Sequence, residues 1–206
     1  MRFRVSALLG VWLLSGAVAV AQTAGDAAKG KQLAYTCQGC HGIPNYKNAA
    51  PMYSVPKLGN QNANYLVAAL KEYAAGDRIH PTMHAQAASN SAQDYADMAA
   101  FFAGKGITMT TTVVGTPPAA AQVCAACHGA NGIALLPDYP NLAGQHADYI
   151  EQALRAYQSG KRKNAVMAGM VGNLKDADIV ALAKFFSSQK GLCDTKEIAD
   201  NNGQCK

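Results

Sequence analysis

Cys37-Gln38-Gly39-Cys40-His41 decides the fold of this chain of 206 residues, and Cys124-Ala125-Ala126-Cys127-His128 repeats the pattern 87 positions later. In a C-x-x-C-H motif, the two thiols add to the vinyl groups of a haem, and the adjacent histidine becomes a ligand of its iron. Two motifs therefore predict two covalently attached haem c groups. The expected attachment residues are Cys37, Cys40, Cys124 and Cys127, and the expected iron ligands are His41 and His128.

Paired cysteines also occur in thioredoxin-like redox motifs and in zinc sites. A thioredoxin-like motif requires a βαβ pattern, which this sequence lacks, and a zinc site would have to recruit both cysteine pairs. With 6 cysteines and 5 histidines in the chain, chance predicts the haem motif only ~0.004 times. We therefore favour haem attachment over both alternatives.

The first 21 residues have the pattern of a secretory signal peptide. Arg2 and Arg4 precede an apolar run from Val5 to Val20, and residues 19–21 fit an A-x-A cleavage site. An uncleaved anchor is the alternative, although the run is short for a membrane span of ~20 residues. Export to the periplasm suits thioether and disulfide chemistry, because that compartment is oxidising. No later segment is as apolar, so we expect no transmembrane anchor after cleavage.

The net charge does not support a nucleic-acid partner. The formal charge of +5 includes Arg2 and Arg4. Two haems would add two propionates each, which brings the processed protein to a net charge of about −1. We expect a nearly neutral protein with local charged patches.

The first half has the pattern of a helical domain. A helix over residues 25–35 should lead into Cys37, and a loop rich in Gly, Pro and Asn follows over residues 42–62. Helical spacing returns from about Ala63 and ends at Gly76. Residues 80–84 contain a proline and should be irregular. Ser91 and Asp94 then form a capping-box pattern for a helix that ends at Gly104.

The second half repeats the first at an offset of 84 residues from the loop onward. Tyrosines, arginines and paired phenylalanines coincide, as in Tyr65 and Tyr149, or Arg78 and Arg162. We therefore expect an all-α fold of two tandem haem domains, each wrapped around its haem and unable to fold properly without it. The expected segments are a signal peptide (1–21), an N-terminal domain (22–104), a linker (105–116), a C-terminal domain (117–190) and a C-terminal extension (191–206).

The sixth iron ligand decides between electron transfer and catalysis at an open iron. In the first half, Met83 is the candidate whose position is matched by a methionine, Met167, at the offset of 84. Met98 lies on an apolar helix face, which favours a packing role, and Met52 has no counterpart in the second half.

Two histidines flank Met83 and are alternative ligands. His80 and His84 correspond to Asn164 and Ala168, neither of which can ligate iron, so Met83 remains the preferred ligand. In the second half Met170 competes with Met167, and the duplication favours Met167.

These features together resemble the dihaem cytochrome c4 family, which consists of two class I cytochrome c domains. The resemblance covers about residues 26–189 and implies haem 1 on Cys37 and Cys40 and haem 2 on Cys124 and Cys127. The implied axial pairs are His41 with Met83 and His128 with Met167. The resemblance also implies two domains related by a pseudo-twofold axis, with the haem propionate edges facing each other. Lys175, at the position of the capping Ser91, and the extension depart from the family pattern.

The expected function is that of a periplasmic electron carrier between respiratory donors and a terminal oxidase or reductase. Its expected partners are redox proteins, with an upstream reductase such as a bc1-type complex. A haem subunit of a dehydrogenase complex is one alternative, and a dihaem enzyme such as a peroxidase or thiosulfate dehydrogenase is another. Lys161, Arg162 and Lys163 could steer docking of an acidic partner, or form part of a solvated loop.

Cys193 and Cys205 are the cysteines outside the haem motifs, and an even remainder in an exported chain predicts a disulfide. Asn201-Asn202-Gly203 supplies a turn between them. We expect the bridge to hold the extension against the end of the helix with Phe185 and Phe186. In the alternative, one of the two thiolates is a haem ligand or a redox partner.

Overall fold

The computed structural model describes residues 24–107, 112–201, 203 and 205. The expected signal peptide and residues 108–111 of the expected linker lie outside the described residues. The described part is helical, with isolated β-bridges and no named strand. Its helices are α1 (Ala27–Leu33), α2 (Tyr35–His41), α3 (Ala63–Ala75), α4 (Pro81–Ala88), α5 (Ala92–Ala103), α6 (Ala121–His128), α7 (Ala147–Gln158), α8 (Ala165–Val171), α9 (Asp176–Ser187) and α10 (Thr195–Asp200).

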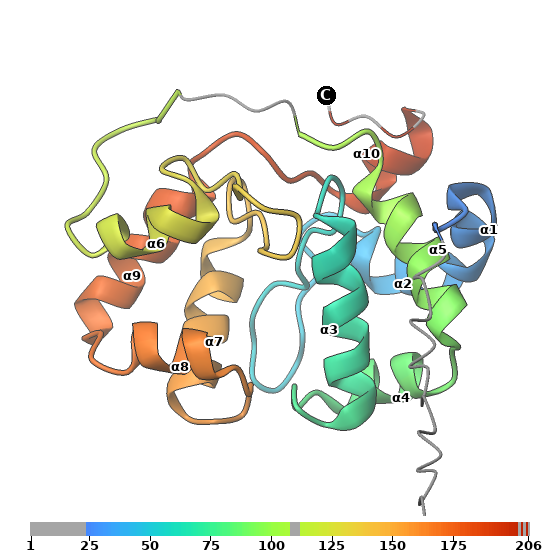
Figure 1. The fold of residues 1–206 in the computed structure, drawn as a ribbon, viewed down its shortest axis with the longest axis horizontal. Coiled ribbons are helices and arrows are strands. Elements are labelled where there is room, and N and C mark those ends of the chain that lie inside the picture. The colour runs from blue at the N-terminus through green and yellow to red at the C-terminus, as the bar shows by residue number, and fades with distance from the viewer. Residues whose placement is uncertain (1–23, 108–111, 202, 204, 206) are drawn as a thin grey trace, which may run out of the picture.

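Two helical domains lie side by side, each with its own apolar core (Figure 1). In the N-terminal domain, α5 packs against α1 and α3 and contributes Phe101 and Phe102 to the core. In the C-terminal domain, α9 packs against α7 and contributes Phe185 and Phe186. The all-α prediction is confirmed. Within the described chain, no helix combines the length and apolarity needed to cross a membrane.

The helix expected over residues 25–35 is broken into two. Asp26 caps α1, because its carboxylate accepts the backbone N–H groups of Ala28 and Lys29 at 2.8 and 3.2 Å. α1 then ends at Ala34, which is fully buried in the N-terminal core. The chain turns at this residue, so α2 carries the first haem motif as a separate helix.

The prediction of an irregular segment at residues 80–84 is wrong. This segment opens helix α4, and Pro81 occupies its first turn. Proline is tolerated there because its missing N–H has no partner inside the helix at that position. The proline therefore begins a helix, and Met83 lies on it.

The predicted helix ends of the first half are otherwise confirmed. Gly76 closes α3 in the left-handed conformation, and Ser91 and Asp94 form the capping box of α5. At α9 the cap is partial: Lys175 donates its backbone N–H to Asp178 at 3.1 Å, without the hydroxyl that Ser91 supplies. The helix scaffold thus tolerates this departure from the repeat.

Candidate haem sites and the interface between them

Each motif histidine is oriented by a proline carbonyl. His41, at the end of α2, donates from Nδ1 to the carbonyl oxygen of Pro56 at 2.8 Å. His128, at the end of α6, donates in the same way to Pro140 at 2.9 Å. A carbonyl oxygen only accepts hydrogen bonds, so Nδ1 carries the proton in both rings. The lone pair of Nε2 is therefore available to bind a metal ion. Burial lowers the pKa of both histidines, which favours this neutral form.

The four motif cysteines are free thiols, each of them partly buried. Burial raises the pKa of Cys37 and of Cys124, so these groups are protonated at neutral pH. The described residues contain no group of three or more His, Cys, Asp or Glu side chains that could bind a metal ion. Free thiols next to an oriented imidazole are the groups that covalent haem attachment uses.

Met83 and Met167 occupy the same place on equivalent helices. Both are partly buried, and each is the third residue of its short helix, α4 or α8. The backbone N–H of Met83 donates to His80 Nδ1 at 3.3 Å, and that of Met167 donates to Asn164 Oδ1 at 3.0 Å. His80 and Asn164 are therefore equivalent N-caps.

The cap explains why a histidine stands beside Met83. Because His80 Nδ1 accepts from Met83, its Nε2 carries the proton and donates to Asn48 Oδ1 at 3.3 Å. His84 is exposed and donates from Nδ1 to the carbonyl of Tyr73 at 2.9 Å. Both rings thus have partners in the protein.

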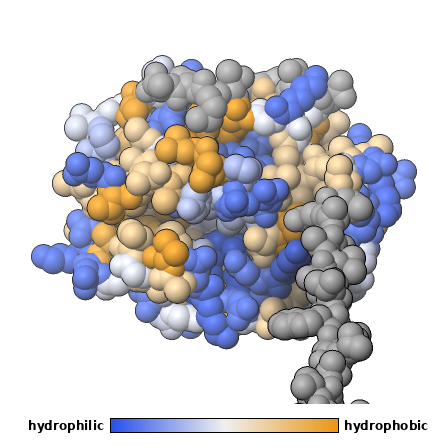
Figure 2. All heavy atoms as spheres, viewed as in Figure 1, coloured by the Kyte–Doolittle hydropathy of each residue, from blue (hydrophilic) through white to orange (hydrophobic). Residues whose placement is uncertain are grey.

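Among the described residues, the other methionines lie in places unsuited to ligation. Met98 is 3% exposed in the core of the N-terminal domain. Met52 and Met170 are 76% and 53% exposed. Large apolar side chains are also exposed close to the motifs in sequence, among them Tyr35, Val123, Leu135 and Leu136. Apolar surface of this kind gathers over the C-terminal domain (left half of Figure 2) and suits a large apolar group such as haem.

The two domains meet in an interface with internal twofold symmetry. The Gln61 side chain pairs with the backbone of Asn141, accepting from its N–H at 2.8 Å and donating to its carbonyl at 3.0 Å. Gln145 pairs with the backbone of Lys57 at 2.9 and 3.0 Å. Gln61 and Gln145 are 84 residues apart, as are Lys57 and Asn141. Each domain therefore binds the other through residues at equivalent positions of the repeat.

Further polar pairs follow the same symmetry. The Ser54 hydroxyl donates to Asp148 at 2.9 Å, and Asn64 Nδ2 donates to Asp138 Oδ1, also at 2.9 Å. Ser54 corresponds to Asp138, and Asn64 to Asp148. The repeat seen in the sequence is thus also the repeat of the interface.

Arg78 and Arg162 form the bridge at the symmetry axis. Their backbones pair antiparallel, with Ile79 N–H donating to Lys161 at 2.9 Å and Lys163 N–H donating to Asp77 at 2.8 Å. Arg162 is 6% exposed and Lys163 pairs with Asp77 at 3.2 Å. The two alternatives for residues 161–163, a basic docking patch and a solvated loop, are therefore both wrong for Arg162, which lies in the interface.

The buried arginines have unequal partners. Arg78 forms an ion pair with Glu72, whereas Arg162 bonds Tyr65 Oη at 2.7 Å and stacks on Tyr157. The Nε of Arg162 is buried without a hydrogen-bond partner. Burial alone would raise the pKa of Tyr65, but Arg162 and Arg78 lower it to about 8. Arg162 also helps to lower the pKa of His128. Among the described residues, Arg162 thus has no anionic partner of the kind that Glu72 is for Arg78. A carboxylate such as a haem propionate carries the negative charge and the acceptor oxygens to fill that role.

Cys193 and Cys205 form a disulfide. The expected location of the bridge is wrong, because both cysteines pack in the core of the N-terminal domain with Phe101 and Phe102. The extension has no counterpart in the repeat, so the duplication does not predict where it docks.

Comparison with known proteins agrees with this arrangement. The cytochrome c family model matches residues 27–104 and 119–190. Cytochrome c4 of Thiocapsa roseopersicina is 40% identical over 190 residues, which cover 82% of this chain and 96% of that protein. A protein of Stutzerimonas stutzeri described as a thiosulfate dehydrogenase electron acceptor is 27% identical over 205 residues, or 86% and 94% of the two chains.

A solved structure shares the arrangement of the whole molecule. The crystal structure of reduced recombinant cytochrome c4 from Pseudomonas stutzeri superposes with a TM-score of 0.64 at 29% identity, covering 81% of this chain and 100% of that chain. With both halves matched and a helical fold in common, the resemblance seen in the sequence is confirmed. The chain belongs to the cytochrome c family and, within it, to the dihaem cytochromes c4, electron-transfer proteins with two covalently bound haem c groups.

Proposed function

We propose that this protein is an exported electron carrier in which each domain binds its haem through the same four side chains. The N-terminal set is Cys37, Cys40, His41 and Met83, and the C-terminal set is Cys124, Cys127, His128 and Met167. The observation that carries the proposal is the equivalence of the two sites. Each has a histidine oriented by a proline carbonyl and a methionine held by the N-cap of its helix.

A haem with histidine and methionine as axial ligands exchanges single electrons at a raised potential, because methionine favours the ferrous state. The chain contributes fixed ligand geometry. Pro56 and Pro140 hold the imidazole rings, and burial keeps them neutral. The caps at His80 and Asn164 hold the helices on which the methionines lie. Ligands held in this way need to move little when an electron arrives.

The symmetric interface supports electron exchange between the domains. The hydrogen bonds of Gln61 and Gln145 and the paired backbones of Arg78 and Arg162 join the two domains at their centre. Arg162 is the residue of this interface best suited to receive a carboxylate of the haem. We propose that electrons enter at one haem and cross this interface to the other.

The proposed location is the periplasm, from the signal-peptide pattern of residues 1–21. The proposed partners are redox proteins, namely an upstream reductase such as a bc1-type complex and a downstream oxidase or reductase. Neither nucleic acid nor a transmembrane anchor has a place in this function.

A second candidate function is that of an electron acceptor for a thiosulfate dehydrogenase, favoured by the Stutzerimonas stutzeri relative of that description. This function differs from the respiratory one in the protein that donates the electrons. In both, the chain acts as an electron carrier. Catalysis of thiosulfate oxidation by this chain alone is disfavoured, because the two cysteines outside the haem motifs are bonded to each other.

The experiment mixes the oxidised holoprotein with thiosulfate, with and without a thiosulfate dehydrogenase, and follows haem reduction in a stopped-flow spectrophotometer. A carrier is not reduced by thiosulfate alone. Reduction of both haems when the dehydrogenase is added supports the acceptor function, and reduction only by a bc1-type reductase supports the respiratory one. Catalytic turnover of thiosulfate by this chain alone would contradict both.

A further inference from the structure

The C-terminal extension crosses from one domain to the other within two residues. Leu192 donates its backbone N–H to Ala143 of the C-terminal domain at 2.8 Å. Cys193 exchanges two backbone hydrogen bonds with Gly59 of the N-terminal domain, both at 3.2 Å. Gly59 and Ala143 are equivalent at the offset of 84, so the crossing lies beside the symmetry axis. We call the described residues of this extension, 191–201, 203 and 205, the C-terminal strap.

Beyond the crossing, the strap completes the core of the N-terminal domain. Thr195 is fully buried, and Ile198, 2% exposed, belongs to the same apolar cluster as Phe101 and Phe102. Helix α10 contacts α2, the helix with the first haem motif. Gly203 accepts from Lys105 N–H at 2.8 Å. Figure 1 shows α10 on the side of the N-terminal domain, away from α9, which it follows in sequence.

The N-terminal domain departs from the repeat where the strap touches it. Gly59 replaces the alanine of the second half, and a Cβ at this position would lie 2.7 Å from Cys193 Sγ. Gly104 replaces Ser188, and a Cβ there would lie 2.5 Å from the Gly203 carbonyl oxygen. Both glycines thus make room for the strap.

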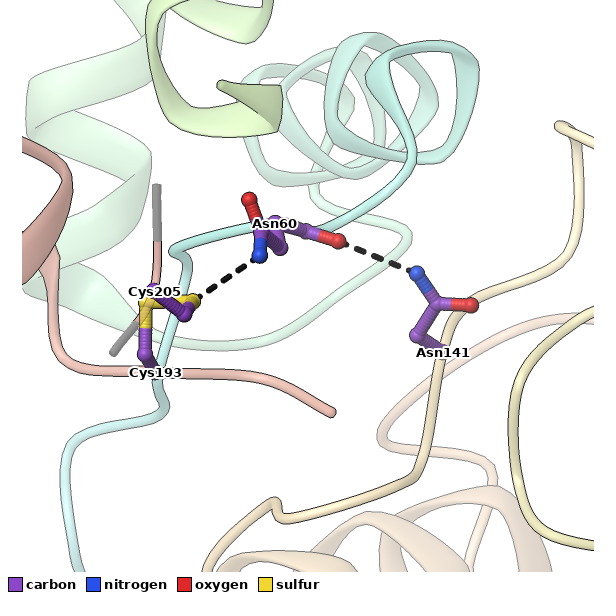
Figure 3. The surroundings of a disulfide bond; sticks show 4 residues. All are labelled: Asn60, Asn141, Cys193 and Cys205. Carbon is purple, nitrogen blue, oxygen red and sulfur yellow. Dashed lines mark hydrogen bonds between the residues drawn. A yellow bond between two sulfur atoms is a disulfide. The ribbon is translucent and has the colours of Figure 1, made fainter. Parts of the chain in front are cut away.

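Asn60 is a third departure and connects the disulfide to the interface. Its counterpart is Gly144, and both have positive φ and donate their N–H to a phenylalanine carbonyl, of Phe102 and Phe186 respectively. The Asn60 side chain adds a bond that glycine cannot make, from Nδ2 to Cys205 Sγ at 2.9 Å. Its backbone carbonyl accepts from Asn141 Nδ2 at 3.0 Å (Figure 3). Asn141 is also the residue whose backbone N–H and carbonyl form hydrogen bonds with the Gln61 side chain.

We propose that the C-terminal strap is a positioning element for electron exchange between the two haems. The Cys193–Cys205 bond fastens the strap to the N-terminal domain, α10 supports α2, and Asn60 links the disulfide to Asn141 in the other domain. None of these residues is a proposed haem ligand, so they act through the placement of α2 and of the interface. The inference rests on the proposed function, in that it requires electrons to pass between the domains.

The test compares wild-type holoprotein with Asn60→Gly and with the double variant Cys193→Ser/Cys205→Ser. Gly144 has a positive φ like that of Asn60, so glycine suits this backbone conformation, and Asn60→Gly removes the Cβ and the side-chain amide. Lys196→Ala, at an exposed position of α10, is the matched control. Three quantities are measured: amide hydrogen exchange of the strap and residues 59–62, the potential of each haem, and the rate of electron exchange between haems after flash reduction.

We expect hydrogen exchange in the strap to rise about 100-fold in the double variant, from the loss of the loop constraint. In both variants, the potential of the N-terminal haem should shift and that of the C-terminal haem should stay at its wild-type value. The rate of electron exchange between the haems should fall in both variants but not in the Lys196→Ala control. Unchanged rates and potentials in Asn60→Gly would overturn the proposal, even if the double variant fails to mature. Failure of the proposed function would appear separately, as wild-type protein whose two haems exchange no electrons.

Discussion

At the scale of single residues, the proposed iron sites depend on which atoms remain free to bind. His41 and His128 each have Nδ1 engaged by a carbonyl, whereas His80 has both ring nitrogens engaged by Met83 and Asn48. A histidine whose two nitrogens have partners must lose one of them before it can ligate iron. The hydrogen bonds thus favour Met83 over His80 as the sixth ligand.

Substitution at the two positions should separate these roles. Met83→His should lower the potential of one haem by a large fraction of the ~0.8 V range that axial ligands span. Met167→His should do the same to the other haem. His80→Asn copies the cap that Asn164 provides, so we expect spectrum and potentials close to wild type. Spectroelectrochemistry measures all three variants, and a large shift in His80→Asn would identify His80 as the ligand.

Asp97 is a second residue with a specific consequence. Its side chain is 1% exposed, and its pKa is lowered to about 2 by the backbone N–H of Asp26 and by the side chains of Lys29 and Gln93. A carboxylate with a lowered folded-state pKa stabilises the fold above its unfolded pKa of about 4, and this contribution is lost as the pH falls toward about 2.

We therefore expect Asp97→Asn to unfold more readily than wild type at pH 6 and to approach it in stability near pH 2. Thermal melts of the holoproteins across this range measure the difference. Asp176→Asn, at an 81% exposed site in the C-terminal domain, is the control and should show little effect. An equal difference at pH 6 and pH 2 would contradict the assigned role of Asp97.

At the scale of elements, α10 belongs to the N-terminal core although it lies at the end of the chain. Ile198→Ala removes a side chain that is 2% exposed and should lower the free energy of unfolding by about 2–5 kcal/mol. Val180→Ala, on α9 and 47% exposed, should change it by less than about 0.5 kcal/mol. Denaturant unfolding measures both, and a neutral Ile198→Ala would mean that α10 is not part of this core.

The elements also show what the sequence could predict. Helices α3 and α5 have apolar periods and end signals that predict them, and the repeat at an offset of 84 residues extends this prediction to α7 and α9. The sequence does not predict helix α4, because a proline usually indicates a break in a helical pattern, whereas in the first turn it starts a helix. The break at Ala34 depends on burial against α5 and the neighbouring core, which no local signal reveals.

Prediction of the site was limited in the same way. The duplication selected Met83 and Met167 because it compares two copies of one local sequence. It also paired Arg78 with Arg162, and two arginines in equivalent positions were a signal for the symmetry axis. The charge of residues 161–163 instead suggested a surface patch. The strap has no second copy, so its contacts with Gly59 and Asn60 required the structure.

At the scale of the whole molecule, the twofold interface makes the two domains one unit. Gln61→Ala leaves the backbone N–H and carbonyl of Asn141 without partners, at a cost of about 1–3 kcal/mol for buried groups. Gln145→Ala should cost a similar amount, through Lys57. We expect the double variant Gln61→Ala/Gln145→Ala to unfold in two calorimetric transitions, whereas the wild type should unfold in one. A single cooperative transition would show that other contacts, such as the strap, hold the domains together.

The central claim is that two haems, each with histidine and methionine as ligands, make this protein an electron carrier. A spectroelectrochemical titration of the purified holoprotein, combined with haem quantification, tests it most directly. The claim predicts two haems per chain, two one-electron transitions, and low-spin iron at both sites in both oxidation states. One haem per chain, or a high-spin iron with an open position, would contradict it.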